Sequence, residues 1–280
     1  MPAQDIADQF ITVILADIKQ NCLKLPTLPE LAVKVRKLSQ DESSNAGQLA
    51  KLVNTDAALS ARLVRISNSP LYRGNSPITS VQMAITRLGN TTVRNLVSSL
   101  VMQQLFQMPS SLRERMRLVW NHSAEVAIIS QILARNFTKL QPDEAMLAGL
   151  LHDIGTLPIL SRAEDFPQIL RDPAALENSI LMLHTQIGKI LLETWNFSPE
   201  IVAAAAEHEE LDRYTAEIDY ADVVLVANLH SYIGKDHRLA TVDWGNVPAF
   251  AKLGMTPAQS LLAMNEAKAE VAETLALLGM

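Results

Sequence analysis

Apolar residues recur along almost the whole chain at the spacing of an amphipathic helix rather than in strict alternation. The first stripe consists of Ile6, Phe10, Val13, Ile14 and Ile18. Residues three or four positions apart share one face of a helix, so each such stripe predicts a helix with one buried face. The spacing predicts further helices over 29–40, 45–54, 57–67, 79–88 and 90–107.

The same spacing resumes after a break at 108–111 (MPSS). It predicts a long helix over 111–137, and QPDE at 141–144 opens the next helix, because proline and acidic residues suit a first turn. We expect that helix to carry His152 and Asp153. Later helices are predicted over 164–171, 173–195, 199–209, 217–234 and 257–278. The sequence therefore predicts an all-α fold of two packed helical bundles.

The break near residue 108 divides the predicted helices into three regions. Residues 1–108 form an N-terminal bundle, residues 109–235 form a second helical core, and residues 236–280 form a loop and a C-terminal amphipathic helix. A chain of 280 residues that is 48% apolar can bury a sizeable core. Its ten glycines are too few for a turn-rich barrel or sandwich.

The net charge and the single cysteine indicate which partners and which cellular compartment to expect. A net charge of −6 disfavours a nucleic-acid partner, because such proteins need a basic face to neutralise phosphates. Cys22 has no second cysteine to pair with, which fits a reducing compartment. The acidic first residues predict no signal peptide, and no apolar run is long enough to cross a membrane. We therefore expect a cytoplasmic protein.

An adjacent histidine and aspartate stand in an otherwise apolar stretch, LAGLLHDIGTLPIL (147–160). Burial of His152 and Asp153 costs free energy unless each gains a polar partner. Gly149 lies one turn before Asp153 and Gly155 follows just after it, so other groups can approach closely. The sequence therefore predicts that partners for the pair come from other helices.

Helical spacing turns further polar side chains toward the interior of the second bundle. They are His122, His184, His208 and Asn228. A lone inward histidine is most simply explained as a hydrogen-bonded core residue. Four histidines and an aspartate from separate helices instead favour a site for a divalent transition metal. Spacing alone leaves both interpretations open.

Several segments resemble known families in continuous order over about residues 22–235. Those similar to the motifs of the HD phosphohydrolase superfamily are NHSAEVA (121–127), LLHDIG (150–155), HTQIGKILLETW (184–195) and EHEE (207–210). Those that resemble the HDOD family, a regulatory offshoot close to HD-GYP proteins, are LPTLPELAVKV (25–35), LAKLVNTDAALSARLVRISNSPLYRG (49–74) and ITSVQMAITRLGNTTVRNLV (78–97). The resemblance implies that the second bundle is HD-domain-like.

The resemblance also implies a ligand set for iron, manganese, zinc or magnesium. The implied ligands are His122, His152, Asp153, Asn228, His184 and His208. Catalytic HD domains carry aspartate at the position that falls here on Asn228. Asp222 is a weaker candidate for that role, because it lies six residues earlier and about 240° away around the helix. His184 and His208 match residues that bind a second metal in HD-GYP proteins.

Three departures from the HD-GYP pattern affect the chemistry. Asn228 keeps an oxygen but removes a negative charge, so a dication is held less tightly. Thr156 stands where HD-GYP phosphodiesterases carry a lysine suited to phosphate, and no Gly-Tyr-Pro follows His208. Much of the metal site is thus retained while the substrate-side signature is absent.

The resemblance implies a bacterial HDOD module that acts in signal transduction without robust catalysis. Its partner would be a signalling protein or a small phosphate-containing ligand. The first alternative is an active metal-dependent phosphohydrolase acting on a phosphodiester or nucleotide, in which Asp153 holds the ion that activates water. The second alternative is a structural scaffold whose polar cluster is held together by hydrogen bonds. The sequence leaves the oligomeric state open.

Overall fold

The computed structural model describes residues 3–40, 45–72, 74–106 and 112–277, and these residues form only helices and connecting segments. The predicted all-α class is confirmed. The first helices are α1 (Ala3–Lys19), α2 (Glu30–Gln40), α3 (Ala46–Val53), α4 (Ala57–Ser67), α5 (Val81–Leu88) and α6 (Asn90–Met102), followed by the 3-10 turn η1 (Gln103–Phe106). The predicted boundary at 108–109 lies outside the described residues.

The remaining elements include the helices that carry the polar cluster. They are α7 (Arg113–Phe137), α8 (Pro142–Leu151), α9 (Thr156–Ala163), α10 (Pro167–Leu170), α11 (Pro173–Thr194), α12 (Pro199–Glu207), α13 (Tyr220–Ser231), η2 (Arg238–Thr241), η3 (Trp244–Asn246), α14 (Pro248–Lys252), α15 (Pro257–Glu266) and α16 (Lys268–Leu277). None of the helices in this part or the earlier described part of the chain is long and apolar enough to cross a membrane.

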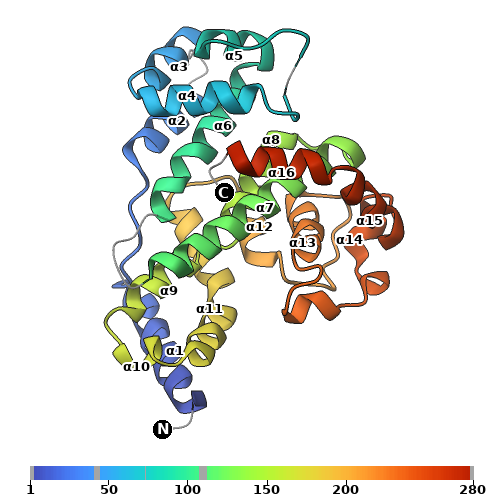
Figure 1. The fold of residues 1–280 in the computed structure, drawn as a ribbon. Coiled ribbons are helices and arrows are strands. Elements are labelled where there is room, and N and C mark those ends of the chain that lie inside the picture. Colours follow the sequence, from blue (N-terminus) through green and yellow to red (C-terminus); the bar gives the residue numbers. More distant parts are fainter. Residues whose placement is uncertain (1–2, 41–44, 73, 107–111, 278–280) are drawn as a thin grey trace.

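The helices fall into an upper and a lower group in Figure 1. Helices α2–α6 pack on one another at the top, and α7 runs beneath them through the centre, with α8 packed against α6 and α7. The first helix, α1, lies at the opposite end, where it packs against α10 and α11. The segment between α1 and α2 consequently runs along one side of the molecule and joins the two groups (Figure 1).

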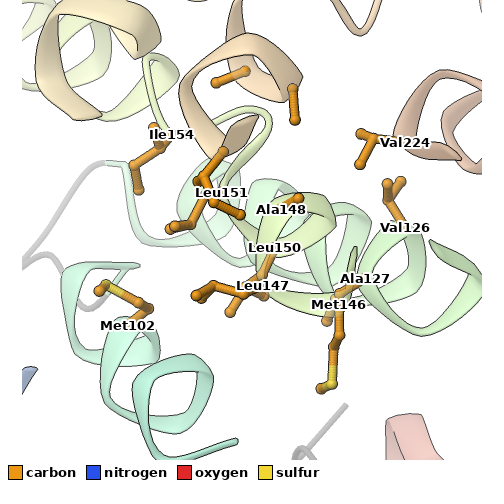
Figure 2. Packing of buried hydrophobic residues seen from close by; sticks show 14 of the residues in the cluster. Met102, Val126, Ala127, Met146, Leu147, Ala148, Leu150, Leu151, Ile154 and Val224 are labelled. Atoms are coloured by element: carbon orange, nitrogen blue, oxygen red, sulfur yellow. The ribbon is translucent and has the colours of Figure 1, made fainter. Parts of the chain in front are cut away.

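Helix α8 is the central element of the core. Every residue from Ala145 to Leu151 is buried, as expected for a helix that is apolar on all sides. It packs against α6, α7, α12 and α13. Figure 2 shows Met102, Val126 and Val224, from three of these helices, around the α8 side chains. The tight packing gives α8, and the His–Asp pair that follows it, one fixed position.

Gly149 allows α8 to lie directly on α7. A Cβ at Gly149 would stand 2.8 Å from the Ala127 Cα and 2.8 Å from the Ser130 Oγ. Real Cβ atoms do not approach a backbone atom so closely, so only glycine fits here. The close approach expected around the His–Asp pair is therefore present on the α8 side.

Several predicted helix boundaries were wrong. The helix predicted over 164–171 is the short α10 alone, and α9 precedes it as a separate helix. Helix α8 ends at Leu151, so His152 is its C-cap residue and Asp153 lies in the turn before α9. The predicted final helix over 257–278 is broken at Ala267, which separates α15 from α16. Helix α16 packs against α7 and α4.

Candidate metal centre

Five polar side chains converge from four helices and the turn that follows α8. Helix α7 carries His122, α11 carries His184, and His152 and His208 are the C-cap residues of α8 and α12. Asp153 follows His152 directly. Three of the histidines are at most 4% exposed, and Asp153 keeps 18% of its side chain exposed. The structure thus brings together five of the six residues that the sequence proposed as ligands.

Asp153 lies between two pairs of histidines. Its Oδ2 is 3.5 Å from the His122 Nε2 and 3.4 Å from the His152 Nε2. Its Oδ1 is 3.5 Å from the His184 Nε2 and 3.3 Å from the His208 Nε2. Each carboxylate oxygen therefore faces one pair, and the two groups of three residues share this single aspartate.

Backbone carbonyls determine which ring nitrogen carries the proton in three of the histidines. The Nδ1 atoms of His152, His184 and His208 donate to carbonyl oxygens within their own helices, at 2.7, 2.9 and 3.1 Å respectively. Since a carbonyl only accepts, Nδ1 holds the proton and the Nε2 lone pair points into the cluster. The Nε2 atoms of His184 and His208 lie 3.3 Å apart, so a cation between them would relieve the repulsion of the two lone pairs.

Burial and the central carboxylate determine the charge of the cluster. Burial lowers the pKa of His152 to about 3 and also lowers the pKa of His122, so both rings are neutral at pH 7. Burial would raise the pKa of Asp153, but the surrounding imidazoles hold that pKa well below its usual value. Burial would lower the pKa of His208, but the hydrogen bond that its protonated ring donates to Asp153 through Nε2, and the charge of Asp153, raise that pKa. Neutral imidazoles and an ionised carboxylate are the forms that bind divalent metals.

Asn228 and Asp222, the two candidates for the ligand expected from α13, differ sharply in their surroundings. Asn228 is buried in α13, and its Oδ1 has no hydrogen-bond partner among the described residues. Asp222 is also fully buried, but its carboxylate accepts hydrogen bonds from Arg213 and Lys252 at 2.6 to 2.9 Å. Asp222 is thus engaged by two cationic side chains, whereas the Asn228 oxygen has no partner among the described residues.

Arg213 ties the segment after α12 to the start of α13. Its Nε donates to Glu207 at 2.6 Å, its two terminal nitrogens donate to Asp219 at 3.0 and 2.6 Å, and it reaches Asp222 at 2.9 Å. Arg213 is 8% exposed, so these bonds are largely shielded from water. They fix the segment that departs from the Gly-Tyr-Pro pattern, directly after His208.

Four further residues, which were not predicted from the sequence, lie at the rim of the cluster. The Tyr232 hydroxyl lies 3.3 Å from the His122 Nε2, and the His237 ring stacks on Tyr232 with centroids 3.6 Å apart. Glu209 lies 3.8 Å from the His184 Nε2 and is hydrogen-bonded to Arg238. Two features of the sequence could have indicated such positions. Glu209 directly follows His208, and Tyr232 lies one helical turn after Asn228.

The donor set fits divalent metal ions. Each half of the cluster offers two imidazole nitrogens and one carboxylate oxygen that lie within 4.8 Å of one another. Imidazole and carboxylate suit zinc, manganese and iron, and a carboxylate shared by two halves suits a pair of ions.

Comparisons with known proteins agree with this architecture. A family model, the HDOD domain, matches residues 25–211, about two thirds of the chain. A solved structure from Shewanella amazonensis SB2B, provisionally assigned as a metal-dependent phosphohydrolase, is 27% identical with a TM-score of 0.82 over 98% of each chain. An HDOD domain protein with unknown function from Geobacter sulfurreducens shares the fold, with 22% identity and a TM-score of 0.67 over 97% of each chain.

A match to part of a longer protein adds a third relative. Ribonuclease Y of Chlorobaculum tepidum is 32% identical over 133 residues, which cover 47% of this chain and 21% of the relative. The chain spans less than half the length of the curated relatives that it matches. The family match covers most of both helical groups and includes all five converging side chains. The chain belongs to the HDOD domain family.

Proposed function

We propose that this chain is a signal-transduction module that holds divalent metal in the His–Asp centre and does not hydrolyse phosphoesters at a substantial rate. The observation that carries the proposal is the position of Asp153, whose two oxygens face two separate histidine pairs at 3.3 to 3.5 Å. Its partner would be a signalling protein or a small phosphate-containing ligand.

The surroundings of the centre support binding without turnover. Thr156, at the position where HD-GYP phosphodiesterases carry lysine, is 3% exposed and brings no positive charge. The segment after His208 is held by Arg213 through bonds to α12 and α13. Asn228 offers an amide oxygen in place of a carboxylate. The chain thus keeps groups that hold metal and lacks those expected to hold and activate a substrate phosphate.

A metal-dependent phosphohydrolase is the second candidate. It is favoured by the similarity over nearly the full length to the Shewanella protein with that provisional assignment. A bound divalent ion supplies a Lewis acid that polarises a phosphoryl oxygen and makes water a better nucleophile at neutral pH. In this case the histidine pairs and Asp153 would hold the ions, the Tyr232 hydroxyl would hold a proton beside His122, and Arg238 would face an anionic substrate.

Metal analysis and one hydrolysis assay test the proposal. Protein purified without chelator is expected to contain near-stoichiometric iron, manganese or zinc. Asp153→Asn should lose the metal, whereas Asp212→Asn, at an exposed carboxylate, should keep it. With Mn²⁺ present, the wild-type protein should not hydrolyse bis(p-nitrophenyl) phosphate. Turnover that disappears in Asp153→Asn would favour the phosphohydrolase, and metal-free wild-type protein would favour the structural scaffold.

A further inference from the structure

We infer that Glu209 is an additional metal ligand for the His184–His208 half of the centre. Arg238 forms a salt bridge with Glu209, and a bound cation would replace the arginine. This inference rests on the proposed metal centre. It assigns a metal-binding role to a residue outside the two groups of three, and a masking role to an arginine from a different part of the chain.

The position of Glu209 is the first argument. Its Oε2 lies 3.8 Å from the His184 Nε2, and its side chain is 16% exposed. Among the described residues, Glu209 is the one carboxylate besides Asp153 within 4.0 Å of an imidazole nitrogen of the cluster. A small side-chain rotation would bring this oxygen to an ion shared with His184 and His208.

Charge is the second argument. Two divalent ions carry four positive charges, and Asp153 contributes one negative charge to both halves. Asn228 contributes none, because its amide is neutral. A second carboxylate would therefore raise the affinity for the second ion more than a neutral ligand could.

The partner of Glu209 is the third argument. The Arg238 guanidinium donates to Oε2, which is the same oxygen that faces His184. Oε2 cannot bind the guanidinium and a metal ion at the same time without a loss of affinity for each, because the two positive charges repel each other. The Arg238 side chain is 42% exposed, so it can turn into water when a cation takes its place. Arg238 and the second metal ion consequently compete for Glu209.

Titration with Mn²⁺ alone tests this competition. We would follow binding to chelator-stripped, full-length protein by isothermal titration calorimetry. Glu209→Gln should weaken binding of the second Mn²⁺ by about tenfold or more, the size expected when a metal site loses a key charged group. Arg238→Gln should tighten it severalfold, because Glu209 is then free. Glu210→Gln, at an exposed neighbour, serves as the matched control and should leave both affinities unchanged.

The two variants must shift the affinity in opposite directions. If the Glu209–Arg238 pair only anchors the surrounding segments, both substitutions would act in the same direction or leave Mn²⁺ binding unchanged, and either result overturns the inference. A wild-type protein that binds one Mn²⁺ also overturns it, while the metal centre stands. A wild-type protein that binds no Mn²⁺ overturns the proposed function itself. Far-ultraviolet circular dichroism confirms that each variant is folded.

Discussion

Gly155 lies against the backbone of His184 with no space for a side chain. A Cβ at Gly155 would stand 1.9 Å from the His184 carbonyl oxygen and 2.4 Å from the Gly188 nitrogen. This contact brings the turn that follows Asp153 onto the middle of α11. The position of Asp153 between the two histidine pairs therefore depends on a residue that contributes no polar side chain.

Gly155→Ala should accordingly destabilise the fold and disturb the centre. The added methyl group meets backbone atoms, which cannot move aside, so we expect a loss of about 3 kcal/mol, at the upper end of overpacking effects. Gly188→Ala is the matched control, because a Cβ there would lie 3.5 Å from the nearest atom, an ordinary contact. Urea unfolding measures both. A Gly155→Ala protein with the wild-type midpoint would contradict this account of the contact.

Loss of one metal-ligating side chain should lower thermal stability mainly in the metal-loaded protein. A ligand that binds only the folded state stabilises it by about 2.7 kcal/mol at one hundred times its dissociation constant. His152→Ala should therefore lower the melting temperature more in metal-loaded protein than in chelator-stripped protein. Differential scanning calorimetry of both forms gives the comparison. Equal decreases would mean that His152 contributes only packing and its hydrogen bond to the Gly149 carbonyl.

His230 should make stability depend on pH. Burial lowers its pKa from 6.5 to about 4, and its Nε2 pairs with the Ser260 Oγ at 2.5 Å. Between these pH values the unfolded chain binds a proton that the folded protein does not. The free energy of unfolding is therefore highest above pH 6.5 and falls as the pH is lowered toward 4.

A glutamine at position 230 should flatten that pH dependence. His230→Gln keeps an amide near Ser260 but does not titrate, so the loss of unfolding free energy between pH 7 and pH 4.5 should be smaller by about 2–3 kcal/mol. Urea unfolding of chelator-stripped wild-type and variant proteins over this range provides the test. Parallel curves for the two proteins would show that His230 does not contribute to the acid sensitivity.

Tyr72 connects the upper helices to α8 through a polar contact. Its hydroxyl donates to the Asp143 Oδ1 at 2.6 Å, and Gln131 donates to the same oxygen at 2.9 Å. In a double-mutant cycle, Tyr72→Phe and Asp143→Asn should show a coupling energy of about 1–2 kcal/mol by urea unfolding. Additive effects of the two substitutions would mean that the upper helices are held to α8 by apolar packing alone.

The buried Arg213 should be among the most sensitive charged positions. Arg213→Met leaves Glu207, Asp219 and Asp222 close together without its charge, so we expect a loss of about 3–5 kcal/mol in unfolding free energy. Arg115→Met is the control, because Arg115 pairs with an exposed Glu177, and a surface pair contributes about 1 kcal/mol or less. Comparable losses in both variants would argue against a special role for the buried network.

The sequence by itself determined the helical class and most of the helices. Apolar spacing is a local property, so it predicts α4 (57–67) without reference to the rest of the chain. The same spacing turned His122, His184 and His208 inward. It also expected the close approach around Asp153 from Gly149 and Gly155, which the structure confirms.

Only the tertiary structure decided how these elements meet. Helical spacing gives the direction of a side chain but not the distance between two helices, which depends on how side chains and backbones pack. Packing therefore decided that each carboxylate oxygen of Asp153 faces one histidine pair. It also decided that Asp222 forms salt bridges with Arg213 and Lys252. It also brought Arg238 to Glu209, a contact between residues twenty-nine positions apart that no local pattern records.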